Sequence, residues 1–417
     1  MKYIMDQELN KKTVLLISQD FPPQGWTSSK RSGGMAKFLK DYGWTPIVLC
    51  QRWTPDNCVH DPSIVTNIPA DITVYAIDVK QVRSMSLKYA KDVLYRVLLP
   101  HLVPRSFFRG ALEALPNIFR KHHIDAIWAT APMACNHALA EWASRKWKRP
   151  WVADFRDVHQ FRSSALKEPI RMLRIYYDDR MLKSASEIIS VSEGFARTLR
   201  TRHSRNVRVI PNGFDPETLA DDQFRANLNF NIVYTGGVNL GKPEFGPLLD
   251  ALGLLIKTGK LNRKDISVEF YGAKNELRLK SMFQNHEFGN IVKNYGHVPR
   301  ERLLDIQRSA AILLQATYSG TGTLSSKIYE YLAARRPILA LPKDHNGIDQ
   351  LLTETRAGVS CTSVDEIAQQ LLKWYEEWKS TNTIKCQSIP SAIMKYSQKV
   401  QAGQLSQLLN ELTNENK

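Results

Sequence analysis

The stretch SGTGTLSSKIYEYLAARRPILAL (319–341) indicates the fold class of this chain. A loop of glycine and hydroxyl residues, 319–323, follows the apolar run AAILLQA (310–316) and opens a helical segment near Ser325. A second apolar run, PILALP (337–342), comes next. Short, branched apolar runs bounded by glycine, proline or polar clusters are typical of buried parallel strands. The stretch therefore predicts a strand, a loop, a helix and a second strand, in that order.

The same alternation runs through the rest of the chain. Further apolar runs predict strands at 13–18, 45–50, 72–77, 125–130, 151–155, 187–192, 207–211, 230–236, 266–272, 291–296 and 357–361. Segments of helical period lie between them, at 28–42, 111–121, 134–147, 168–185, 193–202, 245–257, 276–286, 299–308, 325–335, 346–354 and 363–380. Alternation on this scale predicts an α/β fold with two Rossmann-like, doubly wound domains.

The polar stretch DPETLADDQFRANLN (215–229) is typical of a hinge between two such domains. We therefore expect an N-terminal Rossmann-like domain over 1–214 and a C-terminal one over 215–385. The remaining residues, 386–417, predict a C-terminal helical segment. A chain of 417 residues with 43% hydrophobic residues is long enough to bury a core in each domain.

Composition excludes several classes of protein. Charged residues interrupt every long apolar stretch, and the N-terminal MKYIMDQELNKKT has no apolar core. A transmembrane helix and a signal peptide are therefore not expected. The five cysteines are odd in number and form no CxxC pair, so we expect reduced thiols and a cytoplasmic protein.

Positive charge is concentrated in the first half of the chain. Residues 1–210 hold 33 Lys and Arg against 19 Asp and Glu, whereas residues 211–417 hold 24 against 22. The densest run, 80–121, interleaves basic with apolar and aromatic side chains. Such a segment fits either an anionic membrane surface or a solvated helix face. No zinc-finger spacing or RNP-like aromatic motif favours nucleic acid instead.

Two loops have the residues of a phosphate site. In YTGGVNLGK (234–242), Gly236 and Gly237 allow close backbone approach and Lys242 supplies a cation, although such a glycine turn is often only structural. In 319–341, loop amides form an anion cradle and Lys327 lies in the first helical turn. Glu330 shares the helix face of Lys327. The alternative is a capped helix with a surface Lys–Glu pair.

These residues lie in a wider pattern. The segment 319–341 resembles the donor-binding helix of family-4 nucleotide-sugar glycosyltransferases, which have the GT-B fold of two Rossmann-like domains facing across a cleft. VSEGFARTLRTRHSRNVRVIPNGFD (191–215) resembles the run that closes the first domain of that family. FPPQG (21–25) and YGHVP (295–299) resemble its first loop and its nucleobase turn. The resemblance covers nearly the whole chain.

The resemblance implies a role for each matching residue. Lys242 and Lys327 would bind the donor diphosphate and Glu330 the ribose. The resemblance also implies a nucleobase contact by His297 and Val298 and backbone-amide contacts to the distal phosphate by Gly322, Thr323 and Leu324. The glycine turn of Gly236 and Gly237, expected from its own residues, completes the donor contacts. The donor is a nucleotide-diphosphate sugar, and neither a cofactor nor a metal is expected.

The chain departs from the family pattern at three positions. Gly322 stands where many members carry a glutamate, Gly237 replaces an arginine of the phosphate site, and Arg156 replaces a first-domain histidine. The segment RPWVADFRDVHQF (149–161) offers substitutes, because Arg156 and Asp157 follow a strand end. Asp157 would contact the acceptor or the donor sugar, and Arg156 would neutralise the leaving diphosphate. Alternatively, Asp154 and Arg156 form a structural ion pair.

The expected function is a retaining glycosyltransferase. It would move a hexose-type sugar from a nucleotide-diphosphate sugar to a glycan or lipid-linked acceptor in surface polysaccharide or glycoconjugate synthesis. Its expected location is the cytoplasm, with a possible peripheral contact to the inner face of the membrane through 80–121. The alternative is a non-catalytic GT-B protein that binds nucleotide or glycan and scaffolds a partner enzyme. A nucleotide-sugar epimerase would need carboxylates and histidines around the sugar, and the sequence does not supply such a set.

Overall fold

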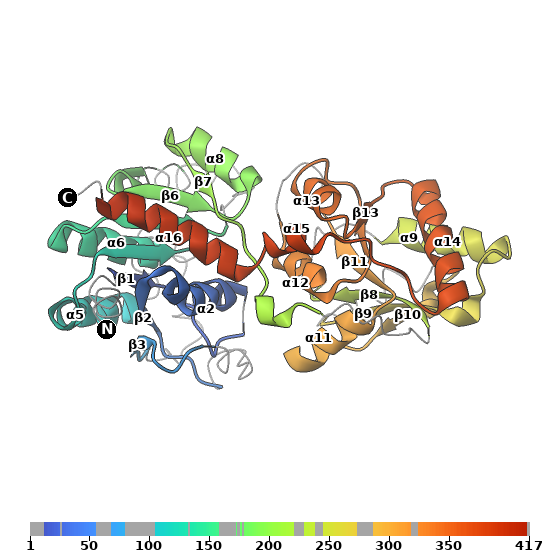
Figure 1. The fold of residues 1–417 in the computed structure, drawn as a ribbon, viewed down its shortest axis with the longest axis horizontal. Helices are drawn as coiled ribbons and strands as arrows, with labels where there is room; N and C mark the ends of the chain where they lie inside the picture. Colours follow the sequence, from blue (N-terminus) through green and yellow to red (C-terminus); the bar gives the residue numbers. More distant parts are fainter. Residues whose placement is uncertain are drawn as a thin grey trace, which may run out of the picture. The chain divides into compact units, whose positions relative to one another are not determined.

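The computed structural model describes most of the chain, in two compact units. The described residues are 12–25, 27–55, 68–79, 105–131, 134–157, 172, 176, 179–220, 229–237, 245–272, 287–317 and 324–414. The first unit comprises Met1–Asn212 and Gln398–Lys417, and the second comprises Gly213–Ser397. Figure 1 shows that each unit has its own sheet with helices around it.

The first unit is built on a parallel sheet in the order β3-β2-β1-β4-β5-β6-β7. Its strands are β1 (Lys12–Ile17), β2 (Trp44–Gln51), β3 (Thr73–Ile77), β4 (Ala126–Thr130), β5 (Trp151–Phe155), β6 (Glu187–Ser190) and β7 (Arg208–Val209). The central strands β1 and β4 are almost wholly buried, which explains their continuous apolar sequence.

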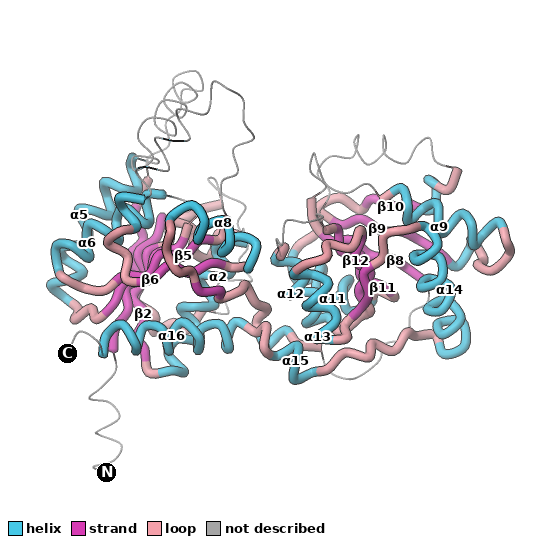
Figure 2. The backbone as a smooth tube through the Cα atoms, turned by 90° about the horizontal axis from the view of Figure 1, so that it is seen from above, coloured by secondary structure: helices cyan, strands magenta, loops and turns pink. Residues whose placement is uncertain are grey.

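Helices cover both faces of this sheet. They are α2 (Thr27–Phe38), continued by η1 (Leu39–Tyr42), and α5 (Arg105–Lys121), α6 (Ala134–Trp147), α8 (Glu193–His203) and α16 (Gln398–Asn414). One core joins α5, α6 and α8 to the sheet, and the other joins α2 and α16 to its opposite face. Figure 2 shows this sandwich, with α5 and α6 on one side of the strands and α16 on the other.

The second unit repeats the plan with a parallel sheet in the order β10-β9-β8-β11-β12-β13. Its strands are β8 (Phe230–Thr235), β9 (Ile266–Tyr271), β10 (Val292–Asn294), β11 (Ile312–Ala316), β12 (Ile338–Leu341) and β13 (Gly358–Ser360). Because β8 lies beside both β9 and β11, the chain crosses over at this strand. Ligands of open α/β sheets bind at such a switch point, outside the carboxyl ends of the strands.

The helices of the second unit also lie on both faces of its sheet. They are α9 (Gly246–Lys257), α11 (Arg300–Ser309), α12 (Ser326–Ala334), α13 (Gly347–Thr355), α14 (Val364–Thr381) and α15 (Pro390–Met394), with short 3-10 turns η4 (Pro216–Thr218), η5 (Arg263–Asp265) and η6 (Gly289–Ile291). One core packs α9 and α14 on the sheet, and the other packs α12 and α13 on the opposite face.

The expected α/β architecture is confirmed, and every predicted strand is present within a few residues. The helix expected at 111–121 begins six residues earlier, at Arg105, because Phe107 continues the buried row of Ala111, Leu115 and Ile118. The helix expected at 276–286 and most of that expected at 168–185 lie outside the described residues.

The C-terminal segment is shared between the units. Residues up to Ser397 belong to the second unit, and the backbone N–H of Phe214 donates to the Tyr396 carbonyl there. Helix α16 belongs instead to the first unit, where Ala402, Leu405 and Leu409 enter the core beside α2. The sequence predicts a single helical segment over 386–417, whereas the structure divides these residues between the two units at Gln398. In the part of the chain that the structure describes, no helix has the length and apolar character needed to cross a membrane.

Candidate donor site at the carboxyl edge of the second sheet

Three neighbouring strands of the second sheet are each followed by a glycine at the carboxyl end. Gly236 directly follows β8, Gly272 follows β9, and Gly296 lies two residues beyond β10. The Gly236 N–H donates to the Tyr271 carbonyl at 2.6 Å, and the Gly272 N–H donates to the Gly296 carbonyl at 2.5 Å. These bonds tie the three turns into one surface, which we call the glycine edge.

Glycine is required at two of these positions. Gly236 has φ +116° and Gly272 has φ +87°, both in the region that side chains disfavour. A Cβ on Gly272 would lie 3.2 Å from the Gly236 Cα atom. A Cβ on Gly236 would lie only 2.3 Å from the Lys327 Cε atom. The missing side chains therefore let the two turns pack closely and let Lys327 extend across Gly236.

Lys327 lies in the first turn of α12 and reaches the end of β8. Its Nζ atom donates to the Tyr234 hydroxyl at 3.1 Å and lies 4.6 Å from the centre of the Tyr234 ring. The Tyr234 hydroxyl donates in turn to the Gly237 carbonyl at 3.2 Å. An ammonium ion is thus held over an aromatic ring beside glycine backbone that carries no side chain, an arrangement that suits an anion.

A buried tyrosine one turn further along α12 fixes the helix on the sheet. The Tyr331 hydroxyl accepts from the Thr235 N–H at 2.9 Å, and Gln307 Nε2 of α11 donates to Thr235 Oγ1 at 3.0 Å. Burial raises the pKa of the Tyr331 phenol, which therefore stays neutral. Because Lys327 and Tyr331 are four residues apart, the same helix face carries both.

The amino end of α12 opens toward the loop that precedes it. Ser325 is its N-cap residue by backbone conformation, and the Gln315 side-chain amide donates to the Ser325 hydroxyl at 3.3 Å. The N–H groups of a first helical turn favour an anion. Glu330 lies three residues after Lys327 and is partly buried, and Leu324 packs on the core below. Gly322 and Thr323 lie outside the described residues.

Aromatic rings flank the glycine edge on the β9–β10 side. Tyr271 and Tyr295 stack with their ring centres 4.8 Å apart and their planes 8° apart. The Tyr271 hydroxyl donates to Glu269 Oε2 at 2.9 Å, which fixes this ring, whereas 48% of Tyr295 is exposed. His297 and Val298 follow directly, with the His297 side chain exposed.

The carboxyl edge of the first sheet contains buried charged side chains. Asp154, at the end of β5, receives both Nε and Nη2 of Arg31 from α2, each at 2.9 Å. Arg31 also donates to the carbonyls of Ile210 and Pro211, at 3.0 and 2.9 Å. The ion pair therefore links α2 to β5 and to the segment that leaves the first unit. The structural partner of Asp154 is Arg31, not the Arg156 considered from the sequence.

Arg156 has a different set of contacts. Its Nη2 atom lies 4.0 Å from Asp20 Oδ2, its Nε atom donates to the Ala131 carbonyl, and its side chain is 8% exposed. Burial lowers the pKa of Arg156 to about 10 and, as the main effect, raises that of Asp20. The neighbouring Asp157 is exposed. Arg156 is thus enclosed in a polar network, and Asp157 faces solvent at its margin.

The structure brings part of the predicted donor set together. Lys327 extends across Gly236 and is linked to Gly237 through the Tyr234 hydroxyl. Gly272 connects Gly236 to Gly296, which directly precedes His297 and Val298. Lys242 lies outside the described residues. Sequence reasoning missed Gly272, Tyr234 and Tyr331, although the glycine at the end of ISVEFYG was a visible signal for the first.

Comparisons with known proteins agree with this architecture. Residues 34–218 match the family model described as Glycosyltransferase Family 4, and residues 247–388 match that of Glycosyl transferases group 1. No curated protein sequence matches the chain significantly. The two family models cover one unit each and, together with the fold, define a GT-B glycosyltransferase.

Solved structures show the same fold at low sequence identity. A glycosyltransferase from Rickettsia africae matches with a TM-score of 0.64 and 15% identity, covering 97% of this chain and 99% of that one. Anabaena HepE, crystallised with UDP and glucose, matches with a TM-score of 0.63 and 15% identity, covering 96% and 100%. WaaG, a glycosyltransferase of lipopolysaccharide biosynthesis, matches with a TM-score of 0.53 and 12% identity, covering 97% and 98%. The chain belongs to the family-4 nucleotide-sugar glycosyltransferases.

Proposed function

We propose that this glycosyltransferase is a retaining enzyme that uses a nucleotide-diphosphate sugar and builds a surface polysaccharide or glycoconjugate. The observation that carries the proposal is Lys327 extended across Gly236, at the switch point of the second sheet. There a diphosphate would meet an ammonium ion, glycine backbone and the amino end of α12. The UDP complex of HepE, a protein of the same fold, supports a nucleoside diphosphate as the ligand.

Each donor residue then contacts a different part of the nucleotide. Lys327 and the first-turn amides of α12 neutralise the diphosphate, and Lys242 with the amides of Gly322, Thr323 and Leu324 completes the phosphate site. Glu330 accepts hydrogen bonds from the ribose hydroxyls. The turn of His297 and Val298 contacts the nucleobase, close to the exposed ring of Tyr295. No cofactor or metal is part of this proposal.

The reaction breaks the bond between sugar C1 and the diphosphate oxygen. The acceptor hydroxyl oxygen forms the new bond to C1 on the same face, and its proton passes to the departing diphosphate. The Lys327 ammonium group stabilises the negative charge that develops on the diphosphate. In a site without water, this stabilisation of the transition state amounts to several kcal/mol. Asp157, which is exposed after β5, would hold an acceptor hydroxyl. For Arg156, direct contact with the diphosphate would require its Asp20 and Ala131 contacts to open.

The test is to follow candidate nucleotide sugars by NMR in the presence of the purified chain. The proposal expects one α-linked donor to be consumed and its sugar to appear first in an α-configured product. The Lys327→Ala variant, prepared in parallel, detects a contaminating enzyme. A β-configured first product would contradict retention. If no donor is consumed, with or without lipid and glycan acceptors, the non-catalytic scaffold becomes the better account.

A membrane partner is the second part of the proposal. The basic run 80–121 lies outside the described residues up to 104, and its remainder forms α5. We expect charge reversal at Lys88, Lys91 and Arg96 to reduce sedimentation with phosphatidylglycerol vesicles. Reversal of the exposed Lys260, Arg263 and Lys264 in the second unit is the matched control. If both variants sediment equally with the vesicles, the basic run 80–121 is a solvated surface and not a membrane contact.

A further inference from the structure

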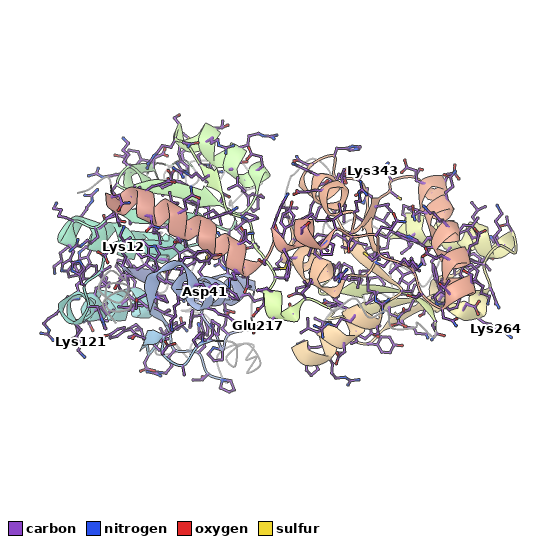
Figure 3. All side chains as sticks on the ribbon, in the orientation of Figure 1. Lys12, Asp41, Lys121, Glu217, Lys264 and Lys343 are labelled. Carbon is purple, nitrogen blue, oxygen red and sulfur yellow. The ribbon has the colours of Figure 1, made fainter. Side chains whose placement is uncertain are left out.

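A basic pocket of about 310 Å³ lies at the amino-terminal edge of the first sheet. It forms where the chain leaves α5 and α6 to enter β4 and β5, at the edge opposite to the carboxyl ends that carry Asp154 and Arg156. Its lining residues are Phe119, Arg120, Lys121, His122, His123, Ile124, Trp147 and Arg149. Figure 3 labels Lys121 beside α5.

Stacked aromatic rings give the pocket a rigid wall. The rings of Phe119 and Trp147 are parallel within 4° and have their centres 3.9 Å apart. Trp142 meets Trp147 edge-on at 5.4 Å. Lys146 Nζ lies 4.8 Å from the Trp142 ring and 5.0 Å from the Trp147 ring, so one more cation borders this wall. The wall fixes the ends of α5 and α6 relative to each other.

The charges that line the pocket are of one sign. Among the described residues, Arg120, Lys121 and Arg149 form no ion pair with a carboxylate, and the lining contains neither Asp nor Glu. Arg120 donates to the neutral amide oxygen of Asn117 at 2.9 Å. By contrast, Arg145 on the exposed side of α6 pairs with Glu141 at 2.8 Å. Cations that converge without a counterion favour an anionic ligand.

The two histidines have defined contacts at the rim. His122 Nε2 lies 2.9 Å from the Tyr75 hydroxyl, and His123 Nε2 lies 3.2 Å from Asp125 Oδ1. The other oxygen of Asp125 accepts the Thr13 N–H at 2.7 Å, so this carboxylate is bound to the first strand. Asp125 is therefore occupied by its own contacts and does not line the pocket.

Helix termini explain part of this charge. Basic side chains in the last turn of a helix interact favourably with its dipole, which covers Arg120 and Lys121 of α5. Arg149 lies two residues beyond the end of α6 and still faces the same pocket. The helix dipole of α5 does not explain why Arg149 lines the same pocket as Arg120 and Lys121. A volume near 300 Å³ is also at the lower end for small-ligand sites.

We propose that this pocket binds a phosphate-bearing anion, of the size of a phosphate monoester or a diphosphate. Arg120 and Arg149 present planar guanidinium groups that match phosphate oxygens, and Lys121 adds a point charge. The site is independent of the donor diphosphate, since it lies in the first unit and uses none of the donor residues. Two sources carry the same chemistry, a free phosphate compound and an anionic lipid headgroup.

The experiment compares two variants of equal charge. Lys121→Gln/Arg149→Gln removes one Lys and one Arg from the pocket, and Lys183→Gln/Arg197→Gln removes one of each from exposed positions elsewhere in the first unit. Both are made in the Lys327→Ala background, so that the proposed donor site contributes no diphosphate binding. Inorganic pyrophosphate is titrated by calorimetry, and phosphatidylglycerol vesicles are titrated by co-sedimentation, with phosphatidylcholine vesicles as the neutral reference.

The proposal expects the pocket variant to lose affinity roughly tenfold or more for at least one probe, while the surface variant stays close to its parent. Loss with pyrophosphate identifies a soluble ligand, and loss with phosphatidylglycerol alone identifies a headgroup. Equal affinities of the two variants would overturn the proposal in favour of diffuse attraction to a basic domain. Failure of the parent to bind either probe would overturn it as well. Circular dichroism confirms that each variant is folded.

Discussion

The carboxyl edges of the two sheets occupy equivalent places in related folds, yet their residues differ in kind. In the first unit, Arg31 and Asp154 are buried as a bidentate ion pair. In the second unit, Gly236 and Gly272 pack backbone to backbone, and the Lys327 side chain extends across Gly236. Buried charge that is already paired holds elements together, whereas open backbone beside a cation leaves room for an anion. We therefore give the Arg31–Asp154 pair of the first edge a structural role and propose donor binding at the second edge.

The largest expected effect is on stability, in the first unit. Arg31→Met would leave the Asp154 carboxylate buried without its partner and should lower the free energy of unfolding by about 3–5 kcal/mol. Denaturant unfolding measures this change. Arg52→Met is the control, because the Arg52–Asp78 pair is solvent-exposed and should contribute less than about 1 kcal/mol. If Arg31→Met lowers the free energy of unfolding by less than about 1 kcal/mol, the Arg31–Asp154 pair has no structural role.

The next effect is on activity, in the second unit. Lys327→Ala should reduce turnover of the donor roughly 10²–10³-fold, because it removes the cation opposite the leaving diphosphate. Its melting temperature should change little. Release of nucleoside diphosphate measures turnover, and Lys264→Ala, an exposed lysine of the same unit, is the control. Unchanged turnover would show that Lys327 does not contact the diphosphate.

Gly236→Ala, compared with a second glycine variant, separates the cost of the backbone conformation from a steric clash with Lys327. Its Cβ would lie 2.3 Å from Lys327 Cε at a backbone φ of +116°, so the lysine must move and donor affinity should fall about tenfold or more. Gly259→Ala is matched, because Gly259 has φ +69° and no atom within 4 Å of the added Cβ. Both variants should lose roughly 1–2 kcal/mol of stability from the backbone conformation. Equal donor affinity in the two would contradict the close fit of Lys327.

Glu330→Ala should weaken binding of the free nucleotide about tenfold, the usual effect of losing a charge-assisted hydrogen bond. Calorimetry with the nucleoside diphosphate measures the change. Glu376→Ala, an exposed glutamate of α14, serves as the control. The ribose assignment fails if both variants bind with the affinity of the parent.

The smallest effect concerns a carboxylate of the second unit that has only a structural role. Glu366 accepts the N–H groups of Thr362 and Ser363, pairs with Lys343, and belongs to the capping box of α14. These contacts lower its pKa, so the stabilisation exists above its ordinary range and is lost as pH falls through the folded-state pKa. Glu366→Gln should therefore lower the melting temperature slightly at pH 7 and not at low pH. A pH-independent difference would assign the effect to something other than this charge.

The strands could be predicted because each is a short apolar run with its own boundary, and periodicity is a local property. The carboxyl-edge contacts could not, because Arg31 reaches Asp154 across 123 positions and Lys327 reaches Tyr234 across 93. The sequence suggests an ion pair between Asp154 and Arg156 because the two residues are close in the chain. In the fold, α2 brings Arg31 to Asp154 instead. Residue types that bind phosphate were visible in the sequence, but the glycine at 272 that joins them depends on β8 and β9 being neighbours.

We propose that the glycine edge, with Lys327 and Glu330, binds a nucleoside diphosphate. Thermal unfolding of the purified chain with UDP, GDP, ADP and CMP tests it most directly. A ligand that binds the native state stabilises it by about 2.7 kcal/mol at a hundredfold excess over Kd. We expect one nucleoside diphosphate to raise the melting temperature of the parent and of Lys264→Ala, but not that of Lys327→Ala. An equal shift in Lys327→Ala, or no shift with any of the four, would contradict it.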